Sequence, residues 1–240
     1  MKTQVRSIFQ PLQRSLLPLC AGALLASPPV FAATSTWNGG SATGNDFSDS
    51  ANWGGTALTS GNSLVFAGLT RLTPNNDLTG LTIGGIYFDP AAGAFTLGGN
   101  AITNTGNILF YGNNNPSTLI TQTVNLDLVI SNSCSINSQS NGTLVVSGTI
   151  SPYPGTYSSS AIFKDNPGHV VLSGPALNVS AVNVRQGYID FGANNFYLNQ
   201  LNLNPATGMT PPTQPISQAD LKGSTQTVTN LSLGANLGAL

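Results

Sequence analysis

The segment from Leu64 to Thr103 reads LVFAGLTRLTPNNDLTGLTIGGIYFDPAAGAFTLGGNAIT, and it decides the fold expected for the chain. Its short apolar runs, rich in β-branched and aromatic residues, are residues 64–66, 81–83, 86–88 and 95–97. The corners between them, which carry Gly, Asn, Asp or Pro, are residues 74–77, 84–85, 89–90 and 98–100. Runs of this kind predict strands and corners of this kind predict turns, whereas no helical period is present.

The same alternation of short apolar runs and polar corners continues to the last apolar run at 227–233, and it predicts one repetitive all-β architecture. The motif Leu-x-Leu recurs at 126–128, 201–203 and 231–233, which indicates that strands of the same kind repeat along the chain. Asparagine makes up roughly a tenth of the chain, well above its ordinary share. Stacked Asn side chains can form hydrogen-bonded ladders between parallel coils. We therefore expect a right-handed parallel β-helix, or β-solenoid, with a β-sandwich as the alternative.

Residues 1–32 have the layout of a secretory signal peptide. Three basic residues, Lys2, Arg6 and Arg14, precede an apolar core at 16–25, and small residues follow near Ala32. This core is shorter than the roughly 20 residues that a membrane-spanning helix needs. We expect cleavage after Ala32 or Ala33, export from the cell and no transmembrane helix; a lipid anchor at Cys20 is the less favoured alternative.

The mature chain is expected to contain a cap and a repeat region. Residues 33–60, with Trp37 and Trp53, predict an N-terminal cap that closes the first open end of the stack, because terminal repeats are atypical. An aromatic sugar-binding platform is the alternative for these tryptophans. The β-solenoid region is assigned to residues 61–240, with loops near 151–160 and 210–224, where prolines disfavour interior strands.

The strand-and-corner pattern also resembles a known family. The residues that carry the resemblance are Leu64-Val65-Phe66, Asn76-Asp77-Leu78, Leu81 to Ile86, Phe88-Asp89, Ala92-Gly93, Phe95-x-Leu97-x-Gly99-Asn100 and Ile102-Thr103. They resemble the autotransporter-associated β-strand repeat proteins, which are very large bacterial secreted or surface proteins. The resemblance implies an architecture and a location outside the cell, but it supplies no catalytic motif. It also implies that the chain is the N-terminal portion of a longer protein.

Charge excludes one class of function. Without the leader, four basic residues remain against eight aspartates, and no glutamate occurs, so the net charge is about −4. Because the sequence offers no basic patch, nucleic acid is not an expected partner. Cys134 is the one cysteine left after removal of the leader, so no intrachain disulfide is expected, and a buried, unreactive thiol is the default interpretation.

The sequence contains few groups for catalysis or metal binding. His169 follows a turn and is interpreted as a strand-edge residue, no G-x-S-x-G elbow occurs, and one His with one Cys is too little for zinc. Calcium is not expected either. The aspartates are scattered one to each run or corner: Asp46, Asp49, Asp77, Asp89, Asp127, Asp165, Asp190 and Asp220. Asp77 and Asp89 are expected at turns, and alternation is expected to point Asp127 and Asp190 outward.

These observations predict a non-enzymatic, adhesin-like structural protein, secreted or displayed on the bacterial surface, with no catalytic, metal or cofactor residues. The expected partners are surface polysaccharide or other cell-surface components, and the open end of the stack permits end-to-end self-association. The alternative is a polysaccharide-binding or polysaccharide-degrading β-helix. It would need aspartates together with Arg71, Arg185 or Lys164 in one groove, near Tyr153 or Tyr157.

Overall fold

The computed structural model describes residues 33–113, 117–139, 141–192, 196–203, 217–222 and 227–233. The chain divides into two units, Met1–Phe31 and Ala32–Leu240, and every described residue belongs to the second. The expected leader at 1–32 therefore lies outside the described residues, as do residues 210–216 and 223–224 of the second expected loop.

The described residues form three sheets. The nine-stranded sheet contains, in spatial order, β1 (Thr34–Trp37), β2 (Ser63–Phe66), β5 (Gly85–Phe88), β8 (Ile108–Phe110), β11 (Cys134–Ser138), β14 (Ala161–Lys164), β16 (Ala181–Val184), β18 (Tyr197–Leu203) and β20 (Thr227–Leu233). The seven-stranded sheet contains β3 (Asn75–Asn76), β6 (Thr96–Gly99), β9 (Ile120–Val124), β12 (Gly142–Val146), β15 (His169–Leu172), β17 (Tyr188–Asp190) and β19 (Gln218–Asp220). The four-stranded sheet contains β4 (Thr82–Ile83), β7 (Ile102–Asn104), β10 (Leu128–Ile130) and β13 (Ile150–Pro152).

All strand pairs in these sheets are parallel. From β2 to β13 the chain visits the nine-, seven- and four-stranded sheets in rotation, and we call one such passage a circuit. Ser63 pairs with Gly85, 22 residues later, and Ala161 pairs with Ala181, 20 residues later. The all-β prediction is confirmed. Parallel pairing weighs against the β-sandwich alternative, because sandwiches are built from antiparallel strands.

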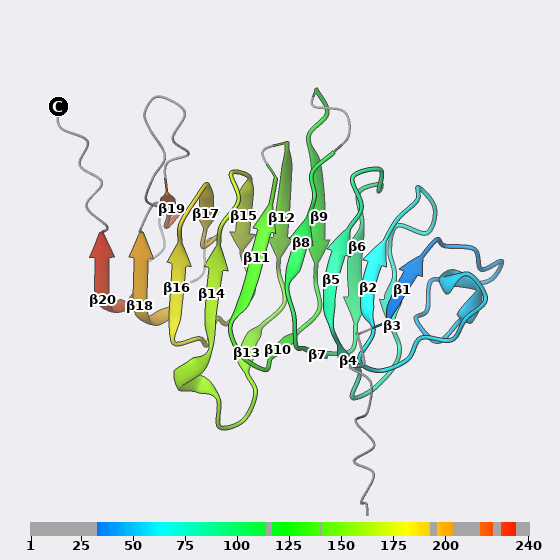
Figure 1. Cartoon of the computed structure of the whole chain (residues 1–240), viewed down its shortest axis with the longest axis horizontal. Coiled ribbons are helices and arrows are strands. Elements are labelled where there is room, and N and C mark those ends of the chain that lie inside the picture. The colour runs from blue at the N-terminus through cyan, green and yellow to red at the C-terminus, as the bar shows by residue number, and fades with distance from the viewer. Residues whose placement is uncertain are drawn as a thin grey trace, which may run out of the picture. The chain divides into compact units, whose positions relative to one another are not determined.

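Figure 1 shows how the sheets are placed. The nine-stranded sheet lies in front with its strands pointing up, the seven-stranded sheet lies behind it with its strands pointing down, and the four-stranded sheet runs along the lower side. Apolar side chains alternate with polar ones along the strands, so the buried residues of each strand face the space between the sheets.

The segment 64–103 folds largely as expected. Its four apolar runs contribute to β2, β4, β5 and β6. Three expected corners differ, because Asn75–Asn76 form β3, Gly85 begins β5 and Gly98-Gly99 belong to β6. The two pairs are in register, Asn75 with Gly98 and Asn76 with Gly99. Corners of successive circuits therefore stack closely enough for their backbones to pair, which a turn signature alone does not reveal.

An aromatic column runs through the N-terminal circuits. Trp37, Phe66, Phe88 and Phe110 occupy equivalent positions in β1, β2, β5 and β8. Neighbouring ring centroids lie 6.2, 5.6 and 6.4 Å apart along the column, and all four side chains are almost completely buried. Aromatic pairs at such distances add to the burial of their area. The column therefore fixes the register of the first four strands of the nine-stranded sheet.

Residues 33–60 contain β1 and the short 3-10 helix η1 (Ser50–Trp53), whose N-cap is Asp49. The indole of Trp53 donates a hydrogen bond to the carbonyl of Phe47 at 2.8 Å, and its ring packs edge-on against Trp37 with centroids 5.1 Å apart. Both tryptophans are buried. The alternative of a tryptophan sugar-binding platform is therefore wrong: these rings fill the interior instead of facing solvent.

The two expected loops contain more regular structure than their prolines suggested. Residues 151–160 include the end of β13 and the 3-10 helix η2 (Tyr157–Ser159). Pro152 is tolerated because β13 is an edge strand of the four-stranded sheet. Within 210–224, residues 218–220 form β19, which pairs with β17, so a loop is wrong for these residues. The reason is Ala219, which continues the inner column of Val170 and Ile189.

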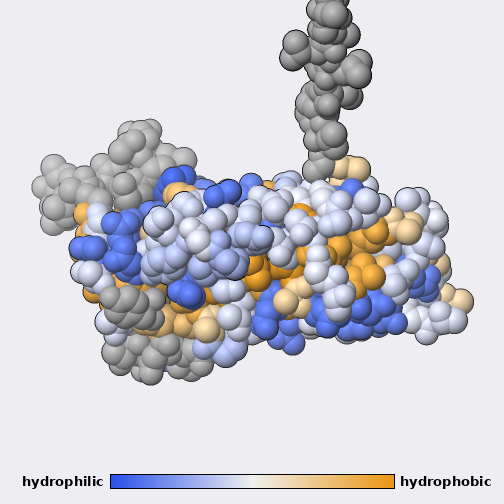
Figure 2. Space-filling view, turned by 90° about the horizontal axis from the view of Figure 1, so that it is seen from below, coloured by the Kyte–Doolittle hydropathy of each residue, from blue (hydrophilic) through white to orange (hydrophobic). Residues whose placement is uncertain are grey.

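The face seen from below in Figure 1 is not uniformly polar. Figure 2 shows a band of apolar residues along it, between polar surfaces. On this side, β10 consists of the three apolar residues Leu128, Val129 and Ile130, and Val129 is only half-buried. This side of the fold therefore presents apolar as well as polar residues.

Candidate functional site

The residues proposed for a catalytic groove do not converge in the described part of the chain. Arg71 lies in the N-terminal circuits, where its guanidinium donates to the side chain of Asn45 at 3.0 Å. Lys164 is completely buried. Arg185 alone among the three basic residues forms an ion pair with an aspartate, Asp165, at 3.1 Å. The grouping that the degrading-enzyme alternative requires is therefore not assembled by these residues.

Four corner aspartates accept hydrogen bonds from backbone N–H groups. These bonds reach Asp49 from Ala51 (3.0 Å), Asp77 from Ser48 (2.9 Å), Asp89 from Ala91 (2.8 Å) and Asp127 from Thr149 (2.7 Å). The expectation of a turn-stabilising carboxylate is confirmed for Asp89, and the outward position of Asp127 is confirmed because it is exposed. The turn expectation is wrong for Asp77, which accepts from the backbone N–H and the hydroxyl of Ser48, 29 residues earlier, instead of from its own turn. These carboxylates hold corners of the fold together.

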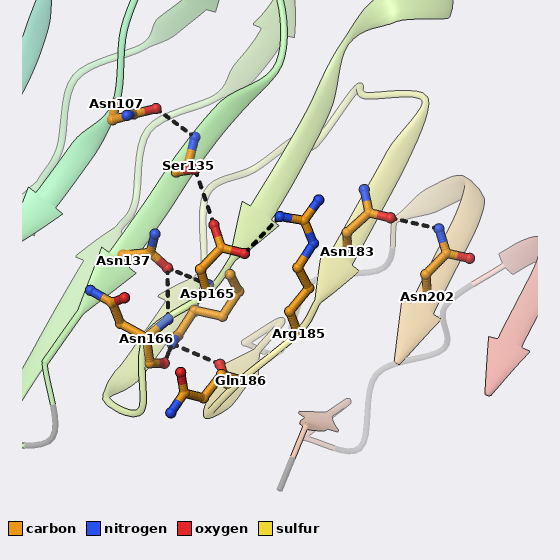
Figure 3. A network of polar contacts seen from close by, with 10 residues as sticks. Asn107, Ser135, Asn137, Asp165, Asn166, Asn183, Arg185, Gln186 and Asn202 are labelled. Carbon is orange, nitrogen blue, oxygen red and sulfur yellow. Dashed lines mark hydrogen bonds and ion pairs between the residues drawn. The ribbon is translucent and has the colours of Figure 1, made fainter. Parts of the chain in front are cut away.

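A polar network on the outer side of β11, β14 and β16 contains the Asp165–Arg185 pair (Figure 3). The hydroxyl of Ser135 donates to the other carboxylate oxygen of Asp165 at 3.2 Å. The guanidinium of Arg185 also stacks over the ring of Phe163, 4.3 Å from its centroid. The Asp165 carboxylate thus interacts with residues of the preceding and the following circuit, and the network connects these circuits.

Asparagine side chains bridge circuits, but mostly not as Asn–Asn ladders. Asn183 and Asn202 form a direct side-chain hydrogen bond of 2.7 Å (Figure 3). Asn137 instead accepts from the backbone N–H of Asp165 at 2.6 Å, and Asn76 donates to the carbonyl of Asn100 at 2.8 Å. The expected ladder is therefore replaced by side-chain-to-backbone bridges.

Lys164 is a buried cation held by carbonyl groups. Its Nζ donates to the carbonyls of Asn166 and Gln186, the latter at 3.1 Å. Burial lowers the pKa of Lys164 to about 8, an effect that the nearby Asp165 carboxylate partly offsets. The ammonium is therefore charged at neutral pH at a cost to stability, and it closes the corner between β14 and β16.

The depressed pKa of Lys164 makes a prediction about pH. Between about pH 8 and the ordinary lysine pKa near 10.5, the unfolded chain binds the proton that the folded chain has lost, so stability rises with pH. We expect the free energy of unfolding of the unmodified protein to rise by about 2 kcal/mol relative to Lys164→Met between pH 7 and pH 9.5. Urea unfolding followed by tryptophan fluorescence measures this difference. Lys222→Met, which removes an exposed lysine, should keep the wild-type slope, and parallel curves for Lys164→Met would contradict the assignment.

A second charged cluster lies at the C-terminal end of the seven-stranded sheet, and the sequence did not indicate it. The Nζ of Lys222 lies 3.5 Å from a carboxylate oxygen of Asp190 and 3.1 Å from one of Asp220. Asp220 also accepts a hydrogen bond from the Tyr188 hydroxyl at 2.6 Å, which contributes most to lowering the pKa of Asp220 to about 2. The expectation that Asp190 faces solvent is wrong, since it is buried beside Lys222. The cluster ties β19 to β17.

His169 begins β15 at the edge of this cluster, as the strand-edge interpretation requires. Its ring packs edge-on against Tyr188 with centroids 4.6 Å apart, and its Nε2 lies 3.9 Å from a carboxylate oxygen of Asp190, beyond hydrogen-bond distance. Burial lowers the pKa of His169, so the imidazole is neutral at pH 7. The arrangement is one of packing, without the close base–carboxylate hydrogen bond of a catalytic triad.

A cleft, here called the tyrosine cleft, lies on the outer face of the N-terminal strands. It has a volume of about 390 Å³ and is lined by Thr34, Ser63, Val65, Tyr87, Asp89 and Tyr111. The rings of Tyr87 and Tyr111 are stacked, with centroids 6.3 Å apart and planes 14° apart. These residues come from β1, β2 and β5 and from the segments that follow β5 and β8, so three successive strands and two adjoining segments build the cleft.

Backbone geometry positions Tyr87. Gly85, two residues earlier on the same face of β5, has a φ of 149°, and a Cβ there would stand 2.9 Å from the ring and the hydroxyl oxygen of Tyr87. The ring of Tyr87 therefore crosses the space above Gly85. Burial raises the pKa of the Tyr87 hydroxyl, which stays protonated at neutral pH and able to donate a hydrogen bond.

The sequence singled out different tyrosines. Tyr153 and Tyr157 are 50% and 38% exposed, but they belong to the segment between β13 and β14 and do not line the tyrosine cleft. The apolar run at 86–88 predicts a strand that contains Tyr87, but it does not indicate a binding site. The signal that could have found the cleft tyrosines is parity: Tyr87 stands one residue from the inward-facing Phe88, and Tyr111 one residue from Phe110, so both must face outward.

Other chemistry can be stated for the described ranges. No three His, Cys, Asp or Glu side chains there lie close enough together to hold a metal ion, and no helix there is long and apolar enough to cross a membrane. Cys134 is buried, as expected, and burial raises the pKa of its thiol to about 12. A thiol in this state is a poor nucleophile at neutral pH.

Comparisons with known proteins add no assignment. No protein-family model matches the chain, and no similar chain was found among curated proteins or solved structures. Membership of the autotransporter-associated β-strand repeat proteins is therefore treated below as a proposal.

Proposed function

We propose that this chain is a non-enzymatic β-solenoid, exported by its leader and displayed on or released from a bacterial surface. Its fold is then a right-handed parallel β-helix related to the autotransporter-associated β-strand repeat proteins. The observation that carries the proposal is the in-register parallel stacking of strands one circuit apart, closed at the N-terminal end by buried aromatic residues. Stacked circuits with an atypical first unit are typical of solenoids.

The placement of the charged groups supports a scaffold over an enzyme. Asp165 and Arg185 connect circuits, Lys222 joins two aspartates across neighbouring strands, and Lys164 is held by backbone carbonyls. Each charge is thus used to hold circuits together. Catalytic groups in polysaccharide-cleaving enzymes need instead to converge on a cleft that admits the polymer.

End-to-end association is part of the same proposal. β20 is the last strand of the nine-stranded sheet, and its sequence, TVTNLSL, contains no charged residue that would oppose pairing. Leu231 and Leu233 are 60% and 66% exposed, although their register partners Leu201 and Leu203 are buried or half-buried. Among the described residues, the inner column therefore reaches β20, the outermost strand of the sheet, where another strand can extend it.

The degrading-enzyme alternative is tested by turnover. The exported protein, purified from producing cells, is incubated with polygalacturonate, alginate and neutral glycans, and new reducing ends and unsaturated products are measured. We expect no product above the level of heat-inactivated protein. Product formation that heat inactivation abolishes and that Arg185→Ala reduces would overturn the non-enzymatic proposal.

A further inference from the structure

We propose that the tyrosine cleft is a binding site for a neutral polysaccharide, whose sugar rings stack on Tyr111 and Tyr87. The inference deepens the proposed surface role by naming what the scaffold binds, and it rests on that role for access to extracellular glycans. It does not depend on the identity of the family.

The lining of the cleft has the composition that a sugar requires. The two tyrosine rings and Val65 provide apolar surface for the C–H faces of a pyranose, and Tyr111 remains 49% exposed. The hydroxyls of Thr34 and Ser63 can donate and accept hydrogen bonds, as can the two phenols. A cleft that mixes apolar surface with a few convergent polar groups is the usual form of a small-molecule site, and about 390 Å³ lies within the usual size range.

The order of the residues on the sheet creates a continuous contact surface. Val65 and Tyr87 are register partners on β2 and β5, so their side chains are neighbours on the outer face. Continuing the Phe88–Phe110 pairing by one residue places Tyr111 beside Asp89. Apolar surface thus runs from β2 toward β8, with the Asp89 carboxylate at its side. A chain of sugar units lying across the strands would contact several of these groups at once.

Charge selects the class of glycan. Asp89 is the one charged residue in the lining, and no basic side chain takes part. The mature chain as a whole carries about −4 net charge. A polyanion such as polygalacturonate would meet this carboxylate without a cation to compensate it, whereas a neutral sugar can donate its hydroxyls to the carboxylate. Neutral polysaccharide is therefore the occupant that the charges favour.

The parallel arrangement of the rings argues against a small-cation cage. Cages for quaternary ammonium groups surround the cation with several aromatic faces. Here the ring planes differ by only 14°, so the two rings do not enclose a common central point. The nearly parallel rings of Tyr87 and Tyr111 suit a ring-shaped ligand with several hydroxyl groups.

Affinity electrophoresis tests the proposal. The exported protein is run in native gels that contain glucomannan, xyloglucan, mixed-linkage β-glucan, galactomannan, arabinoxylan or starch, with polygalacturonate as the charged comparison. We expect retardation by at least one neutral polymer and none by polygalacturonate. Tyr111→Ala should weaken binding at least fivefold, whereas Tyr153→Ala, which removes an equally exposed tyrosine outside the cleft, should leave it unchanged.

The outcomes separate this inference from the proposed function. Absence of binding to every neutral polymer, binding that Tyr111→Ala does not weaken, or displacement of the polymer by choline would each overturn the cleft assignment. Retardation that is lost in Tyr111→Ala supports it, whether or not the polymer is also cleaved. Cleavage of the polymer would contradict the non-enzymatic proposal alone. An exported protein that binds no glycan would contradict the cleft assignment alone.

Discussion

Replacing Phe66 by alanine is expected to lower the free energy of unfolding by about 3–5 kcal/mol, the range for truncating a buried aromatic residue. Phe66 is completely buried, and its ring lies within 6.2 Å, centroid to centroid, of five aromatic neighbours. Those neighbours are Trp37, Phe47, Trp53, Phe88 and Phe95. The substitution therefore opens a cavity where the cap meets the aromatic column.

Urea unfolding followed by circular dichroism measures this loss, and tryptophan fluorescence reports on the site directly because both tryptophans contact Phe66. We expect the emission of Phe66→Ala to shift to longer wavelength as water reaches the indoles. Tyr153→Ala, at a residue 50% exposed, should change the free energy of unfolding by less than about 0.5 kcal/mol. A loss below about 1 kcal/mol for Phe66→Ala would mean that the cap does not pack on this column.

Gly148→Ala is expected to destabilise the protein by about 3 kcal/mol, at the upper end of the usual cost of overpacking. A Cβ at Gly148 would stand 1.9 Å from the carbonyl oxygen of Leu126 in the preceding circuit. In the next circuit, a Cβ at Gly174 would stand 1.9 Å from the carbonyl oxygen of Gly148. Because the obstacle at Gly148 is the backbone of the preceding circuit, the extra methyl group forces these two circuits apart.

Gly98→Ala is the matched control, since a Cβ there meets no atom within 4 Å and the backbone does not require glycine. It should leave the free energy of unfolding within about 0.5 kcal/mol of the wild-type value. Thermal and urea unfolding of the two variants side by side make the comparison. Equal stability of Gly148→Ala and Gly98→Ala would be incompatible with backbones stacked this closely.

The all-β fold and most strands of the segment 64–103 could be predicted from its sequence, because short runs such as Leu64–Phe66 bury alternate residues and end at Gly, Asn or Pro. Strand pairing between corners could not be predicted. Asn75–Asn76 carry a turn signature, and they form a strand only because the next circuit places Gly98 and Gly99 beside them. The register between circuits determines whether a corner residue forms a strand. Because the circuits differ in length, this register cannot be predicted from the sequence pattern.

Candidate sites were harder to predict than the fold. The expected role of Asp89 was confirmed because it depends on local chain geometry, whereas Asp77 and Asp127 bind backbone N–H groups 29 and 22 residues away in the sequence. Asp190 was misplaced, since its burial depends on Lys222, 32 residues later in the sequence. The tyrosine cleft was missed for the same reason: Tyr87 and Tyr111 meet only after one complete circuit separates them. These sites form by stacking of circuits that are distant in the sequence, and a single run of residues does not predict such contacts.

The most direct test of the exported scaffold is the N-terminus and location of the protein in the cells that produce it. Mass spectrometry of the N-terminal peptide should find a chain that begins at Ala33 or Thr34, after cleavage behind Ala32 or Ala33. Protease added to intact cells should reach the surface-bound protein, and the remainder should be found in the medium. A chain that keeps Met1 and the basic leader and is protected inside intact cells would contradict the account.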